Sequence, residues 1–175
     1  ITSLMKLDQN RAKSILSNKL NISVSQISQL VVWGNHSATQ FPDLNHSLVS
    51  NNDVPIKSLD QKWIEDAFIP RVQKRGAEII EHRGKSSAAS AASAIYDHLY
   101  ILVNGSKDWE SMGVMMENTY GINDEIFFSF PLQVLDSNID IINGLDVSEV
   151  SMKYIKDSEK ELLMERDIIK EILKG

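Results

Sequence analysis

Residues 126–142 have the sequence IFFSFPLQVLDSNIDII, which decides the fold class. Its aromatic and β-branched residues predict one strand over Ile126–Leu135 and another over Ile139–Ile142. The preceding segment Ser111–Glu117 favours a further strand, and the turn-forming sequence of residues 120–124 connects it to the first. Three consecutive strands joined by short turns predict an antiparallel meander.

Helical patterns flank these strands. Apolar residues spaced as on one helix face predict helices over Leu7–Leu20, Asp60–Glu81 and Ser86–Asn104, the second with a break or kink at Pro70. From Ser148 onward, an amphipathic closing helix is expected to dock its apolar stripe on the domain. Because helices and strands do not alternate as in βαβ units, the sequence predicts an α+β fold, with an antiparallel sheet packed against long helices.

The composition excludes several kinds of chemistry. The 175 residues include no cysteine, so disulfides, thiolate nucleophiles and cysteine-ligated metals are ruled out. A net charge of −6 gives no footprint for nucleic acid or an anionic membrane, and no apolar run is long enough to span a bilayer. The histidines lack metal-ligand spacing, so no metal is expected, and no glycine-rich nucleotide-binding motif occurs.

One histidine lies where catalytic groups tend to be found. A short β-rich run over Gln29–Trp33 is predicted to end at Gly34, and a polar loop is expected from there to about Pro55. His36 follows directly after the strand, so a rigid element would hold its imidazole. With an ordinary pKa near 6.5, the ring is suited to carry a proton at neutral pH. The alternative is a solvated loop histidine.

Two further patterns carry chemistry. Asp8 and Arg11 are spaced i, i+3, which places both on one face of the first predicted helix. They form either an ordinary surface ion pair, or an orienting carboxylate beside a guanidinium fork for a substrate carboxylate. The small residues of Ser86–Ala94 allow another surface to approach closely, either a packing helix or a ligand.

These motifs together resemble a known family. Leu7–Arg11 (LDQNR) resembles the L-D-x-x-R helix of the 2-hydroxyacid dehydrogenases, which include the lactate and malate dehydrogenases. Trp33–Asp43 (WGNHSATQFPD) is similar to the catalytic-histidine loop of the cytosolic malate dehydrogenase branch. The match continues in order and at fitting spacing at Gln73–Ala77, Ser86–Ala88, Ser111–Val114 and Tyr120–Ile122.

The resemblance implies a domain assignment. Residues 1–175 would be the C-terminal, substrate-binding and catalytic half of an NAD-dependent malate dehydrogenase. The Rossmann half that holds NAD would precede Ile1, which agrees with the lack of an initiator methionine. The resemblance further implies malate and oxaloacetate as substrates, a role in the tricarboxylic acid cycle, a cytoplasmic location and a homodimer. The surface that meets the absent half is expected to be apolar, so the isolated piece should self-associate.

The resemblance also implies a role for individual residues. His36 would be the acid/base catalyst, Asp8 the carboxylate that orients its ring, and Arg11 the clamp for the C1 carboxylate of the substrate. Ser87 would line the pocket beside substrate and nicotinamide. The family's substrate-selecting arginines would lie in the absent half, so a lactate dehydrogenase or another 2-hydroxyacid dehydrogenase stays open. A non-catalytic binding or dimerisation module on the same scaffold is the other alternative.

Overall fold

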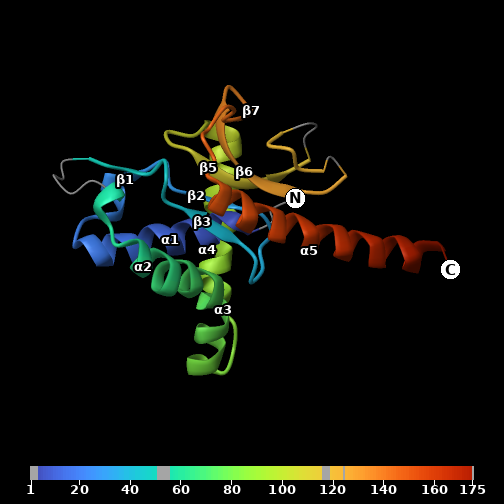
Figure 1. Ribbon diagram of the computed structural model, residues 1–175, viewed down its shortest axis with the longest axis horizontal. Coiled ribbons are helices and arrows are strands. Elements are labelled where there is room, and N and C mark those ends of the chain that lie inside the picture. Colours follow the sequence, from blue (N-terminus) through green and yellow to red (C-terminus); the bar gives the residue numbers. More distant parts are fainter. Residues whose placement is uncertain (1–3, 51–55, 116–118, 124, 175) are drawn as a thin grey trace.

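Long helices surround small antiparallel sheets in this protein, which confirms the predicted α+β class (Figure 1). The structure is a computed structural model and describes residues 4–50, 56–115, 119–123 and 125–174. Among these residues, no helix has the length and apolarity needed to cross a membrane. The helices are α1 (Met5–Leu20), α2 (Gln61–Trp63), α3 (Ile69–Arg83), α4 (Ala88–Asn104) and α5 (Glu149–Lys174).

The predicted meander forms the main sheet. Strands β5 (Glu110–Val114), β6 (Phe128–Leu135) and β7 (Asn138–Ile141) pair antiparallel in the order β5-β6-β7. Phe128 and Phe130 on the central strand are fully buried, because one face of the sheet packs into the core. Residues 116 and 117, predicted to end the first strand, and residue 124, predicted to lie in the following turn, are outside the described residues.

The segment expected to be a polar loop contains two strands, so that prediction was partly wrong. Strand β2 (Val31–Trp33) pairs with β3 (Phe41–Asp43), and β1 (Ile27–Ser28) pairs with β4 (Leu48–Val49). These strands are only two or three residues long, too short for an alternating pattern to reveal them. Residues 51–55 of the predicted loop lie outside the described residues.

The irregularity expected at Pro70 lies just before it. Helix α2 continues into a π-helical segment over Ile64–Phe68 and then into α3, where Pro70 stands in the first turn. Proline has no backbone N–H to donate to the carbonyl of Asp66, and the wider turn accommodates the missing bond. The chain therefore stays helical through the proline.

Strand β2 is fixed against the main sheet by two serines. The backbone N–H of Val32 donates to Ser111 Oγ (2.8 Å), and Ser129 Oγ donates to the carbonyl of Val32 (2.8 Å). Gly34 and Ser129 exchange two backbone hydrogen bonds of 3.1 and 2.9 Å. The point at which the chain leaves β2 is therefore held rigidly.

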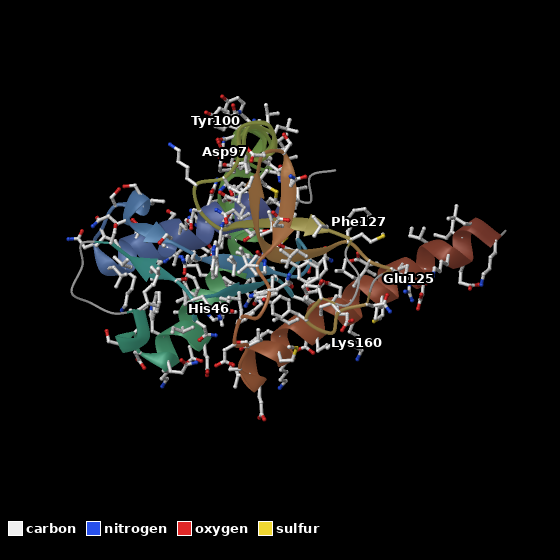
Figure 2. The ribbon with its side chains drawn as sticks, turned by 90° about the horizontal axis from the view of Figure 1, so that it is seen from above. His46, Asp97, Tyr100, Glu125, Phe127 and Lys160 are labelled. Carbon is white, nitrogen blue, oxygen red and sulfur yellow. The ribbon has the colours of Figure 1, made fainter. Side chains whose placement is uncertain are left out.

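Helix α5 docks over only its first half, contrary to the expectation that its whole apolar stripe packs on the domain. Ile155 and Ser158 are fully buried, whereas Ile169 and Leu173 are 54% and 80% exposed. The far half of α5 extends beyond the body in Figure 1, and Figure 2 shows Glu125 lying close to it. Beyond this point no described element reaches the helix, so its apolar residues stay exposed.

Helix α4 carries a histidine with an unusual environment. His98 is 5% exposed, and its Nδ1 has no hydrogen-bond partner among the described residues. It lines a cavity of about 360 Å3 together with Met112 and Phe127. Burial lowers the pKa of His98, and the positive charge of Lys6 acts in the same direction.

This environment predicts a loss of stability in mild acid. Because the folded-state pKa of His98 lies below the value of about 6.5 in an unfolded chain, its contribution is complete above pH 6.5 and is lost as the pH falls through the folded-state pKa. We expect the drop in unfolding free energy between about pH 7.5 and about pH 5.5, measured in urea, to be smaller in His98→Leu than in the parent. His82→Asn, at an exposed position, should keep the parent's drop. An equal drop in parent and His98→Leu would contradict the prediction.

Candidate active site

The buried carboxylate of Asp8 contacts both other candidate residues from the first part of the chain, Arg11 and His36. Asp8 has no solvent exposure. Its Oδ1 accepts a hydrogen bond from Arg11 Nη1 (3.1 Å), and its Oδ2 is hydrogen-bonded to Nδ1 of His36. Asp8 is therefore not part of a surface ion pair. The helical spacing and the turn after β2 bring a carboxylate, a guanidinium and an imidazole into one group.

Helix α1 is anchored on either side of Asp8. Gln9 Nε2 donates to the carbonyls of Leu30 (2.9 Å) and Trp109 (2.8 Å). Lys6 donates to the carboxylate of Glu110 and to Gln9 Oε1 (3.2 Å). Burial raises the pKa of Glu110, and the Lys6 ammonium opposes that effect. These buried bonds fix the position of α1, so Asp8 is presented from a rigid element.

The turn that carries His36 passes very close to α5. Gly34 has φ of +96°, and a Cβ placed on it would lie 2.1 Å from Ser158 Oγ. A glycine is required here both for the backbone conformation and for the space. The backbone N–H of Asn35 then donates to Ser158 Oγ (2.8 Å).

Helix α5 also binds the turn through a carboxylate. Glu161 accepts hydrogen bonds from the hydroxyls of Ser37 and Thr39 and from the amide of Asn35. Burial raises the pKa of Glu161, but these three hydrogen bonds outweigh it and hold the pKa below its usual value. Neither Ser158 nor Glu161 was among the site residues predicted from the sequence. Their i, i+3 spacing on α5 was visible, but nothing local connected it to a loop more than a hundred residues earlier.

The orientation of the His36 ring determines which nitrogen is available. A carboxylate accepts hydrogen bonds, so Nδ1 carries the proton that is shared with Asp8. Nε2 is then the nitrogen left to exchange a proton with another molecule. The side chain is 34% exposed, so a small molecule can reach it. The geometry suits a general acid or base whose tautomer is fixed by its carboxylate.

Arg11 reaches a cavity on the other side of Asp8. Its Nη1 lies 3.9 Å from where a Cβ on Gly76 would be. The cavity, about 350 Å3 in volume, lies between α1, α3 and α4, and its polar lining comprises Asn10, Arg11, Ser14, Asn18, Arg71, Arg75 and Ser90. Neither His36 nor Asp8 lines it. Arg11 therefore lies between the histidine–carboxylate pair and this arginine-lined cavity.

The remaining residues named from the sequence lie apart from this group. Ser87 precedes α4 and shares a hydrogen bond with Ser90, but among the described residues it forms none with His36, Asp8 or Arg11. His46 Nε2 is hydrogen-bonded to the carbonyl of Asp146 (3.0 Å). Within the described part of the chain, no group of three histidine, aspartate or glutamate side chains is arranged to hold a metal ion.

Comparisons with known proteins point to one family. The chain matches the lactate/malate dehydrogenase, alpha/beta C-terminal domain, over residues 5–173. It is 44% identical over 173 residues to a malate dehydrogenase of Corynebacterium jeikeium (strain K411), a match that covers 98% of this chain and 52% of the relative.

Solved structures give the same answer. The malate dehydrogenase of Naegleria fowleri superimposes with a TM-score of 0.92 at 39% identity, over 98% of this chain and 53% of that one. The lactate dehydrogenase of Trichomonas vaginalis, in complex with NADH and oxamate, gives 0.90 at 31% identity, over 96% and 53%. The chain thus spans about half the length of these relatives. It belongs to the lactate/malate dehydrogenase family, and it folds as the alpha/beta C-terminal domain of that family.

Proposed function

We propose that this chain supplies the substrate-binding and proton-transfer half of an NAD-dependent malate dehydrogenase, which interconverts malate and oxaloacetate. The observation that carries the proposal is the bridging position of Asp8, which binds the ring of His36 through one oxygen and Arg11 through the other. An oriented proton carrier next to a carboxylate-binding fork is what a 2-hydroxy acid requires.

His36 moves the proton in this proposal. When malate is oxidised, Nε2 takes the proton of the C2 hydroxyl, and in the reverse direction it returns that proton to the developing alkoxide of oxaloacetate. Asp8 holds Nδ1, which fixes the tautomer and stabilises the imidazolium that forms. The C2 carbon must then lie within reach of Nε2, which requires that the substrate be held by another group.

Arg11 is that group. A guanidinium has five N–H donors, and the hydrogen bond to Asp8 uses one of them, which leaves donors for a bidentate bond to the C1 carboxylate of the substrate. Because the Asp8 carboxylate contacts both Arg11 and His36, the clamp and the proton carrier are held in a fixed relation. Positioning of this kind contributes a large part of the rate enhancement in bimolecular reactions.

NAD, when bound, accepts the hydride from C2 of malate. The residues present do not form a site for the dinucleotide, since the sequence has no glycine-rich phosphate-binding turn and the described strands pair antiparallel. We therefore assign NAD to a further, Rossmann-type half of the enzyme, which fits the match to about half of each relative. On this proposal Ser87 lines the pocket beside the nicotinamide.

The exposed apolar residues fit a larger assembly. On α4, Tyr96, Leu99, Tyr100 and Val103 are exposed at helical spacing, and Figure 2 shows Tyr100 at the outer edge of the molecule. The far half of α5 also exposes large apolar residues, although these alternate with charged ones. Surfaces of this kind normally contact another domain or subunit. We propose that these faces meet the Rossmann half and a second copy of the chain in a cytoplasmic homodimer.

A lactate dehydrogenase is the second candidate, favoured by the likeness to the Trichomonas vaginalis enzyme. The two activities share the proton carrier and the carboxylate clamp, so the described residues support both. Assaying oxaloacetate against pyruvate in the whole enzyme separates them. Failure of both substrates would favour a non-catalytic binding module on the same scaffold.

The 175-residue chain by itself is expected to show no dehydrogenase activity, because it lacks a site for the hydride acceptor. The measurement is NADH oxidation with oxaloacetate, followed by absorbance, with the whole enzyme as positive control. Turnover by the isolated chain would contradict the assignment of NAD to a separate half.

In the whole enzyme, Asp8→Asn and Arg11→Lys are expected to fail in different ways. Asp8→Asn removes the carboxylate that fixes the His36 tautomer, so we expect kcat to fall about 1,000-fold or more. Arg11→Lys keeps the charge but loses the planar fork, so we expect kcat/KM to fall mainly through a higher KM. Steady-state kinetics over a range of oxaloacetate concentrations distinguishes the two patterns.

An equally large rise in KM for Arg83→Lys, the same change at an exposed position at the end of α3, would indicate that Arg11 has no special role. Full activity in His36→Asn would refute the proposed function itself.

A further inference from the structure

A single carboxylate oxygen on helix α5 binds the loop that carries His36. Glu161 Oε2 accepts hydrogen bonds from the Ser37 hydroxyl, from the Thr39 hydroxyl (2.5 Å) and from the Asn35 side-chain amide (3.3 Å). Asn35 and Ser37 are the chain neighbours of His36. The carboxylate therefore restrains the chain immediately before and after the histidine.

Ser158, one helical turn before Glu161, also binds this loop. Its hydroxyl accepts a hydrogen bond from the backbone N–H of Asn35 (2.8 Å) and lies 3.1 Å from the hydroxyl of Thr39. Ser158 and Glu161 are spaced i, i+3, so they present one polar face of α5 to the loop. Gly34 makes this close approach sterically feasible.

An ionised carboxylate is suited to this task. Hydrogen bonds to a charged acceptor are about twice as strong as those between neutral groups. The Ser37 and Thr39 hydroxyls each have a single proton, and for both of them Glu161 Oε2 is the charged acceptor within hydrogen-bonding distance. A glutamine at this position would offer one neutral oxygen and an amide that donates, so it would hold the loop less firmly.

Asp8 alone does not fix the imidazole in space. The bond to Nδ1 restrains one edge of the ring, but the ring can pivot about that bond if the loop backbone moves. Proton transfer requires Nε2 to come within about 3 Å of the substrate oxygen. A displacement of about 1 Å in such a group can lower the rate about 100-fold.

We propose that Glu161 is a positioning residue for His36: it touches neither substrate nor cofactor, and it sets the place of the proton carrier by holding Asn35, Ser37 and Thr39 on α5. The inference rests on the proposed function, and it adds a contribution from a side chain that lies more than 120 residues beyond the histidine in the sequence.

The test is Glu161→Gln in the whole enzyme, with oxaloacetate and NADH. We expect kcat to fall about 10- to 100-fold. KM for oxaloacetate should stay within about twofold, because the proposed clamp, Arg11, lies on α1 and not on the loop. The solvent deuterium isotope effect on kcat should rise, since proton transfer becomes slower than the other steps. Asp157→Asn removes a charge from an exposed position on α5 and should leave all three quantities unchanged.

A double-mutant cycle tests whether Glu161 acts on His36 through its hydrogen bonds to the loop. Ser37→Ala combined with Thr39→Val removes the same hydrogen bonds from the loop side. Its effect and that of Glu161→Gln should not add, because both remove one set of contacts. A merely structural loss of folded protein would lower the apparent activity of each variant and leave the isotope effect at the parent's value, which would overturn the proposal.

The proposal and the proposed function fail in different ways. If His36→Asn abolishes turnover while Glu161→Gln keeps the parent's kcat and isotope effect, the positioning role is wrong and the function stands. If the parent itself has no activity on oxaloacetate or pyruvate, the proposed function fails. Hydrogen–deuterium exchange of residues 33–41 then tests whether Glu161 restrains the loop. Faster exchange in Glu161→Gln than in parent and Asp157→Asn supports the holding of the loop, and equal exchange overturns it.

Discussion

A carboxylate without solvent exposure is the constraint on which this molecule depends. Removing an ionised group such as Asp8 from water carries a penalty of several kcal/mol, and the penalty is offset only when both oxygens find good partners. Arg11 and His36 are those partners. The loop after β2 and the first two turns of α1 must therefore meet at one place, and much of the surrounding structure serves to bring them there.

The surrounding structure does so with polar contacts made inside the core. Two serines from the main sheet fix β2, and Gln9 fixes α1 by donating to two backbone carbonyls. Buried polar networks of this type specify one arrangement, because any shift leaves donors and acceptors unpaired. Helix α1, the loop after β2 and helix α5 are separate segments of the sequence. The apolar core alone would not fix their positions relative to one another.

The sequence predicted those features that depend on local periodicity. The helix over Leu7–Leu20 and the three-stranded meander have enough residues for their spacing to be seen, and the structure has both. The i, i+3 relation of Asp8 and Arg11 needed only the helix, and their contact is present. The family resemblance, carried by the same segments, is confirmed by the match over residues 5–173.

What the sequence did not predict depends on tertiary contacts. Strands β3 and β4 are two or three residues long and exist because β2 and β1 lie beside them. Only the first half of α5 packs on the described part of the domain, and the apolar periodicity of the helix does not show where that packing ends. Glu161 and Ser158 were part of an ordinary polar helix face until the fold placed the loop against them.

The contact between Gly34 and Ser158 limits how this protein can change over evolutionary time. Any side chain at position 34 would occupy the space of the hydroxyl at position 158, and shrinking residue 158 to make room would leave the N–H of Asn35 without its acceptor. Neither position is free to vary by itself. Both residues are therefore expected to be retained together in homologues, which restrains sequence change in α5 at this one turn.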